Sequence, residues 1–266
     1  MSVDEVLINR SYQKLREQSG GSQWLRRYLG YNSWDMTEWE DDFNASVIET
    51  TYKWPAGNLW NSGGAGAADL AMAANSSTAT MVSGTTDNGV VGATFGKLMW
   101  YGQNDAVCAA RVHLGAAVAN AKIEFGFTDD IEDDAGILND GQVTTPTWTA
   151  GDGAAWTYDT DATDATTVWQ HHAVAATVGD ATTKTVTTLV PVASTYQRLV
   201  VALKGTSSRY LLLDATDALQ YDSGWKAYGV TTDTALIPAL FVTSRATTTK
   251  TLTIDQIQVW QRRSIT

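Results

Sequence analysis

The chain of 266 residues carries a formal net charge of −11 at pH 7, 44% hydrophobic residues and one cysteine, Cys108. The negative charge repels phosphate groups and so argues against binding to nucleic acid or to an anionic membrane. A single cysteine excludes an intrachain disulfide framework, and no apolar run is long enough to predict a membrane span.

The N-terminal part predicts two short helices. Residues 3–18 carry apolar side chains at roughly helical spacing and are followed by two glycines, a typical helix stop. Residues 22–29 form a second amphipathic segment, which Ser22 could cap and Gly30 closes. We therefore expect a partly helical arm over residues 1–36. It is too short to fold alone, so its apolar face needs a partner, either the body of this chain or another subunit.

From residue 37 onward Thr, Ala, Val, Gly and Asp dominate, and turn signals recur roughly every 8–15 residues. Apolar and polar side chains alternate over 106–118, as they do in a half-buried strand. Further strands are expected at 122–128, 166–178, 184–190, 196–203, 210–214, 240–244 and 251–260. The segment 129–167 shows little periodicity, and we expect a short hairpin within it because long structureless segments are rare in compact domains. The pattern predicts one all-β domain over 37–266.

The last expected strand changes parity along its length. Leu252 and Ile254 share one parity, whereas Ile257 and Val259 share the other. A regular half-buried strand cannot place both pairs on one face, so we expect a β-bulge near residues 255–256. The alternative is a central strand that is buried on both faces.

Several motifs in this body occur in a recognisable order. They are Trp39-Glu40-Asp41-Asp42-Phe43, Ile123-Glu124-Phe125-Gly126-Phe127-Thr128-Asp129, Thr195-Tyr196-Gln197-Arg198-Leu199-Val200-Val201 and Thr253-Ile254-Asp255-Gln256-Ile257-Gln258-Val259-Trp260. This order resembles the concanavalin A-like, laminin-G-like jelly-roll proteins, in particular those in tailed-bacteriophage particles. The resemblance covers roughly residues 37–263. Many relatives have a turn with a glycine at the place of residues 211–218, and this chain has no glycine there. Whether these residues form a hairpin is therefore left open.

The resemblance implies an antiparallel jelly-roll (concanavalin A-like) β-sandwich with a short N-terminal helical arm. It also implies a non-enzymatic structural protein of a virion, assembled in the host cytoplasm. On this interpretation the chain is a capsid decoration or head-fibre protein and a homo-oligomer, and its partners are the major capsid protein or other virion proteins. The alternative is a carbohydrate-binding module, or a tail-fibre or receptor-binding component of the same fold, with a host glycan as partner.

Tryptophans concentrate in and beside the arm, and such side chains can anchor interfaces or stack on sugars. Their place next to an amphipathic arm favours the interface. The residues predicted to dock the arm onto another protein are Trp24, Leu25, Arg26, Arg27, Tyr28, Trp34 and Trp39. If the chain instead binds a glycan, the expected contacts are Trp148, Trp156 and Trp225, which we predict to lie exposed on loops.

The sequence does not predict an enzyme. Glycoside hydrolases with this sandwich fold carry a strand with the motif Glu-x-Asp-x-(x)-Glu. The retaining enzymes need two carboxyl groups about 5–5.5 Å apart. Glu124 instead stands alone between apolar neighbours. His171 and His172 are adjacent on an expected strand, so they should point to opposite faces and cannot easily share a metal.

No cofactor is expected, apart from a structural calcium ion that an acidic run could hold. Asp130, Glu132 and Asp134 supply carboxylates at alternate positions, which suits oxygen coordination of Ca²⁺. Relatives of the resembled family often bind calcium at a loop rim. The alternative is a solvated acidic loop that keeps the protein soluble.

Overall fold

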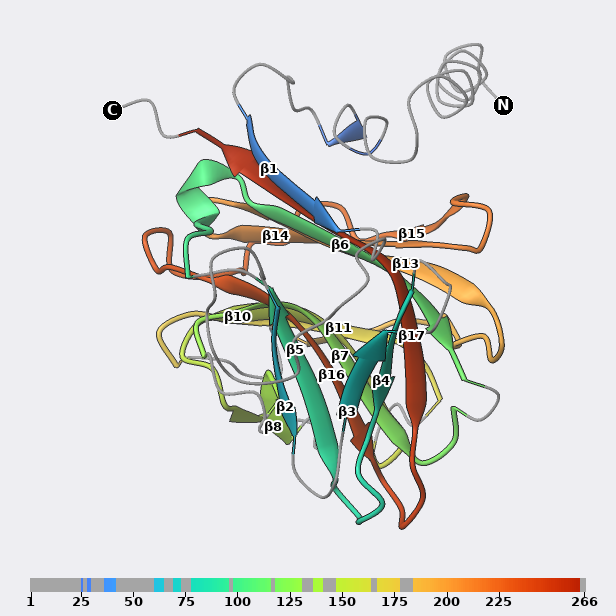
Figure 1. The fold of residues 1–266 in the computed structure, drawn as a ribbon. Coiled ribbons are helices and arrows are strands. Elements are labelled where there is room, and N and C mark those ends of the chain that lie inside the picture. Colours follow the sequence, from blue (N-terminus) through green and yellow to red (C-terminus); the bar gives the residue numbers. More distant parts are fainter. Residues whose placement is uncertain are drawn as a thin grey trace.

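The structure is a computed structural model that describes residues 25, 28–29, 36–41, 60–64, 69–72, 78–95, 98–115, 118–130, 136–140, 147–163, 167–177 and 184–263. In these residues two antiparallel sheets stack face to face, with the hydrophobic core between them (Figure 1). The predicted all-β sandwich is confirmed. None of the helical residues described belongs to a helix that could cross a membrane.

One sheet has eight described strands. Its order is β15 (Leu219–Asp222), β14 (Ser207–Leu213), β13 (Tyr196–Lys204), β6 (Val107–Leu114), β17 (Thr251–Arg262), β4 (Ala79–Val82) and β3 (Asp69–Met72), and β1 (Met36–Asp41) also pairs with β17. β1 starts at Met36, the last residue of the predicted arm.

The other sheet has seven described strands. Its order is β12 (Lys184–Val186), β11 (Gln170–Val174), β10 (Gly153–Asp159), β7 (Ala121–Thr128), β16 (Ile237–Ser244), β5 (Val90–Phe95) and β2 (Trp60–Gly64). β8 (Leu138–Asp140) and β9 (Thr147–Trp148) pair separately as a small hairpin, which confirms the hairpin expected within 129–167. A 3-10 turn, η2 (Gly102–Asn104), precedes β6.

β10 is a strand that the sequence pattern did not predict. All seven of its residues are buried, because its two faces lie against the inter-sheet core and beneath the β8–β9 hairpin. A strand covered on both sides needs no alternation of apolar and polar side chains. The Ala- and Gly-containing sequence of β10 therefore gives no strand signal, and this strand adds to the hairpin that was expected within 129–167.

β17 contains the predicted bulge. Its register with β6 shifts between Ile254 and Gln256. The shift lets Ile254 and Ile257, which lie on opposite parities, both enter the inter-sheet core. Asp255, at the bulge, pairs with Arg111 of the neighbouring strand.

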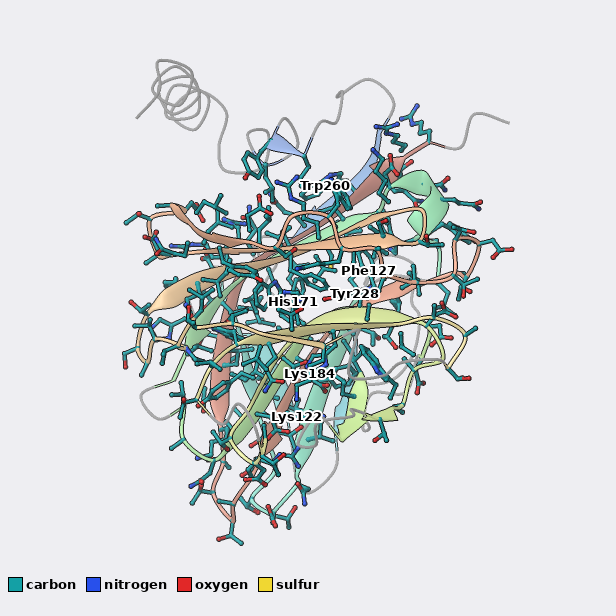
Figure 2. All side chains as sticks on the ribbon, turned by 180° about the vertical axis from the view of Figure 1, so that it is seen from behind. Lys122, Phe127, His171, Lys184, Tyr228 and Trp260 are labelled. Carbon is teal, nitrogen blue, oxygen red and sulfur yellow. The ribbon has the colours of Figure 1, made fainter. Side chains whose placement is uncertain are left out.

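The described residues Leu25, Tyr28 and Leu29 of the arm pack on the outer face of the eight-stranded sheet. Leu25 is helical and 0% exposed, and it joins a second apolar cluster that includes Val200, Leu211 and Trp260. Figure 2 shows Trp260 on the opposite side of this sheet from the core. Of the two partners considered for the arm, these described residues contact the body of the chain.

This packing changes the expected docking surface. Leu25 is enclosed by the chain's own sheet, and the Tyr28 hydroxyl donates a 2.7 Å hydrogen bond to Asp222. Leu25 is therefore not free to dock onto another protein, contrary to the prediction, whereas Tyr28 is only half-buried and its docking role stays a prediction. Trp39 lies in β1, paired with Val259. Its side chain lies outside the described part of the structure, as do Trp24, Arg26, Arg27 and Trp34.

The hairpin left open by the missing glycine does form, between β14 and β15. Asp217 takes the left-handed conformation there, with φ of 59°, which Asp tolerates better than most residues. The Asp214 carboxylate accepts hydrogen bonds from the backbone N–H groups of Thr216 and Ala218, at 2.8 and 3.0 Å. These side-chain bonds replace the conformational freedom of glycine.

Candidate functional site

Two groups of polar side chains stand out, and the first is buried. It lies on the outer face of the seven-stranded sheet, beneath the β8–β9 hairpin. Lys122 and Glu124 form an ion pair of 3.2 Å there, and the Glu124 side chain is 0% exposed. Its carboxylate also accepts hydrogen bonds from the backbone N–H groups of Ile137 and Leu138, at 3.1 and 2.8 Å. Lys122 donates to the Leu138 carbonyl.

This buried pair is closed to a substrate. Burial raises the pKa of Glu124, and the adjacent Lys122 and the two backbone donors oppose that rise. Directly across the sheet, Glu124 faces Thr157 and Phe241, so neither cross-strand neighbour supplies a second carboxylate. The arrangement fixes the β8–β9 hairpin onto the sheet and lacks the open pair of acids that glycoside hydrolysis requires.

The adjacent histidines point to opposite faces of the seven-stranded sheet, as predicted. His171 lies between the two sheets, while Lys122 lies on the far side of the lower sheet in this view (Figure 2). The His171 ring stacks on Tyr210 with a centroid distance of 4.1 Å. His172 faces outward, and its ring centroid is 6.1 Å from that of Trp148.

Both histidines are held neutral. Burial lowers the pKa of His171 to about 3 and also lowers the pKa of His172 well below its ordinary value. Neither ring nitrogen of His172 has a hydrogen-bond partner among the described residues. Protonation would place an unpaired charge in the protein interior, which is strongly unfavourable.

We expect stability to fall as the pH is lowered below about 6.5, the ordinary pKa of imidazole. The unfolded chain then binds protons that folded His171 and His172 reject, so the unfolding equilibrium constant should rise by up to about tenfold per pH unit for each histidine. Urea unfolding at pH 7.5, 6.5 and 5.5 measures this slope. In the variant His172→Gln, the slope of the unfolding free energy against pH should fall by the contribution of about one proton. An unchanged slope would contradict the lowered pKa of His172. The raised pKa of Glu124 acts in the opposite direction in both proteins and cancels in the comparison.

The tryptophans predicted to contact a sugar occupy three different environments. Trp156 is 0% exposed and lies in β10, not on a loop, and its indole N–H donates a 3.0 Å hydrogen bond to the Val200 carbonyl of the opposite sheet. No ligand can reach it, so the prediction for Trp156 was wrong. Trp148 is half-buried in β9 and covers the outer face of the seven-stranded sheet. Trp225 is 39% exposed and lies after β15.

Trp225 belongs to the second polar group, which we call the Trp225 cluster: Tyr28, Lys204, Arg209, Asp222 and Trp225. The Lys204 Nζ and Arg209 Cζ atoms lie 6.0 and 5.9 Å from the Trp225 ring centroid. The Arg209 guanidinium also lies 5.1 Å from the Tyr28 ring centroid. The members come from the arm, β13, β14, β15 and the loop after β15, which meet on one side of the eight-stranded sheet.

The charges in the Trp225 cluster are organised around Asp222. Its carboxylate pairs with Arg209, with 2.8 Å between Arg209 Nε and Asp222 Oδ1, and accepts the Tyr28 hydroxyl. Burial alone would raise the pKa of Asp222, but Arg209, Tyr28 and the Gly224 backbone N–H together outweigh it and lower that pKa. Burial and the neighbouring carboxylate raise the pKa of Tyr28 to about 12. The cluster is therefore a preorganised network at neutral pH.

The backbone around Trp225 is held on both sides. The Gly224 N–H donates a 2.8 Å hydrogen bond to Asp222, and Gly224 adopts φ of 62°, a conformation that glycine reaches without strain. Lys226 exchanges two backbone hydrogen bonds with Ser208, at 2.7 and 3.2 Å. The ring is thus presented by a fixed loop. Sequence reasoning found Trp225 but missed Lys204, Arg209 and Asp222, because only the sheet brings these positions together.

The expected calcium ligands are only partly described. Asp130 is half-buried, and its backbone N–H donates a 3.0 Å hydrogen bond to the Thr128 hydroxyl. Glu132 and Asp134 lie outside the described residues. Within the described ranges, no group of three or more His, Cys, Asp or Glu side chains is arranged to hold a metal ion. The calcium site stays a prediction.

Solved structures of similar fold exist, although no protein-family model and no curated protein matches the chain. A protein of unknown function from Shewanella oneidensis MR-1 is 15% identical, covers 87% of this chain and 88% of its own, and has a TM-score of 0.60. The exoplasmic/lumenal domain of VIP36, in a Ca²⁺- and Man2-bound form, is 9% identical over 85% and 89%, with a TM-score of 0.56.

The lectin UEA-II, complexed with galactose, is 10% identical over 85% of this chain and 98% of its own, with a TM-score of 0.55. Identities this low show the fold alone. That fold is the concanavalin A-like jelly roll, which confirms the fold implied by the sequence resemblance.

Proposed function

We propose that this protein is a non-enzymatic carbohydrate-binding protein and that the Trp225 cluster contacts the sugar. The observation that carries the proposal is the exposed, fixed ring of Trp225. It is the one exposed aromatic side chain among the described residues. The apolar C–H face of a sugar ring can stack on an indole, whereas the polar edge of the sugar needs hydrogen-bonding groups nearby.

Those polar groups are present in the cluster. Arg209 and Asp222 hold each other in a fixed orientation beside the ring, and Lys204 adds a flexible donor. Preorganised side chains lose little conformational entropy on binding, which favours affinity. The similar folds that carry mannose in VIP36 and galactose in UEA-II support a sugar as the ligand. The closed Lys122–Glu124 pair supports binding without hydrolysis.

Replacing Trp225 with Ala should abolish or weaken glycan binding by about tenfold or more, as loss of a central aromatic contact does, and should leave the fold intact. A glycan array identifies the bound sugar, and isothermal titration then compares the variant with the parent protein. Val192→Ala is a matched control, because Val192 is also exposed but lies outside the cluster. The proposal fails if no glycan on the array is bound or if Trp225→Ala binds as the parent does.

The location on a tailed-phage virion, with capsid partners and a homo-oligomeric state, stays a proposal that rests on the sequence resemblance. A glycan-binding surface would fit a virion component that contacts the host surface. Imaging the tagged protein on intact particles tests this location, and its absence from purified particles would exclude it.

A further inference from the structure

The charge around Trp225 contrasts with that of the whole chain, and the inference drawn from it rests on the proposed function. The protein carries a net charge of −11, yet two cationic side chains, Lys204 and Arg209, flank the exposed ring. A neutral sugar would need only hydrogen-bonding groups there. A local excess of positive charge on an acidic protein selects for ligands with negative charge.

The two cations play different roles. Arg209 is neutralised by Asp222, through two donors on one carboxylate, so it contributes orientation and little net charge. Lys204, at the exposed end of β13, forms no ion pair with any described residue. Its 6.0 Å separation from the Trp225 ring is the outer limit of a cation–π contact. The ammonium group therefore lies near the ring and can still donate hydrogen bonds to a ligand.

Among the described residues, Lys204 acts on the pKa of one acidic group, Asp105. Burial raises the pKa of Asp105, and Arg262 and Lys204 oppose that rise. Asp105 is already paired with Arg262 at 3.1 Å. The ammonium group of Lys204 is therefore available to a ligand that lies on Trp225.

We propose that the Trp225 cluster binds saccharides that carry an anionic substituent, a carboxylate or a sulfate, with Lys204 as the anion contact. The sugar ring stacks on Trp225, and its charged group lies toward Lys204. Lysine offers a compact charge with rotatable donors and no fixed fork, so it accepts either anion without demanding a planar one. Asp222 holds the Arg209 guanidinium in place, and the Arg209 N–H groups that do not bond Asp222 donate to the neutral hydroxyl groups of the sugar.

The test compares ligands that differ in charge alone. Isothermal titration measures two matched pairs, trigalacturonic acid with its methyl ester and a sulfated galactose trisaccharide with its unsulfated form. Each pair is titrated into the parent protein and into Lys204→Gln, Lys204→Arg, Lys250→Gln and Trp225→Ala. We expect the parent protein to bind the charged member of at least one pair about fivefold more tightly than its neutral partner, the upper range for an exposed ion pair. Lys204→Gln should remove this preference, Lys204→Arg should keep it, and the control Lys250→Gln should not change it.

The outcomes separate this inference from the proposed function. If neutral and charged sugars bind equally and Trp225→Ala weakens both, the cluster is a glycan site without charge selection and the inference is wrong. The same holds if the preference survives in Lys204→Gln. If no glycan on the array, neutral or charged, binds the parent protein, the proposed function itself is wrong. Preference for the acid over the sulfated sugar, or the reverse, identifies which anion the site takes.

Discussion

Replacing Lys122 with Met is expected to lower the free energy of unfolding by about 3–5 kcal/mol, the usual cost of breaking a buried ion pair from one side. The Glu124 carboxylate would keep its two backbone donors but lose its counter-charge in a fully buried position. The penalty should shrink at low pH, because the carboxyl group then becomes neutral in the folded protein. Urea unfolding followed by circular dichroism measures both effects.

Two further variants isolate the charge from the shape. Glu124→Gln removes the carboxylate charge while keeping the side-chain volume, and Lys122→Met combined with Glu124→Gln leaves no buried charge at this pair. The double variant should recover much of the stability that Lys122→Met alone loses. A loss of less than about 1 kcal/mol in Lys122→Met would show that the pair contributes little and that the backbone donors alone hold the carboxyl group.

Replacing Trp156 with Ala should lower the free energy of unfolding by about 3–5 kcal/mol, as removal of a large core side chain does. Its ring makes edge contacts with Trp169, His171 and Tyr210, at centroid distances of 6.3, 5.4 and 5.9 Å. Its indole N–H also bonds across the sandwich to Val200. The variant would have a cavity where the ring packs and would lack one hydrogen bond between the sheets.

Trp225→Ala is the matched control for Trp156→Ala, because the same substitution at an exposed position should change stability by less than about 0.5 kcal/mol. Denaturant midpoints of the two variants provide the comparison. Glycan binding should show the reverse pattern, with loss in Trp225→Ala and retained binding in whatever fraction of Trp156→Ala stays folded. Equal midpoints for the two variants would contradict the assignment of Trp156 to the core.

The fold was largely predictable because strand formation leaves a local signal. Alternation over 106–118 placed β6, and the change of parity between Ile254 and Ile257 placed the bulge in β17. Each of these signals arises within a few consecutive residues. β10 was missed for the same reason, since a strand that is buried on both faces carries no alternation.

The sequence singled out Trp225 as a sugar contact and Tyr28 only as a docking residue of the arm. Trp225 stands out by type, but Lys204, Arg209 and Asp222 are ordinary polar residues in their own strands. Tyr28 reaches Asp222 from 194 positions away along the chain. No local pattern indicates that these side chains meet, because the meeting depends on the order of strands in the sheet and on where the arm packs.

The amino-acid sequence by itself determined the fold class, the lack of a disulfide framework, the bulge in the closing strand and the opposed directions of His171 and His172. All of these follow from residue type and from the period of a strand. The tertiary structure decided which side chains are accessible. Trp156 and Trp225 are chemically identical, yet one lies between two sheets and the other in solvent, and Leu25 is enclosed by its own sheet. Exposure depends on which distant segment covers each face of a sheet, and a local pattern carries no record of that segment.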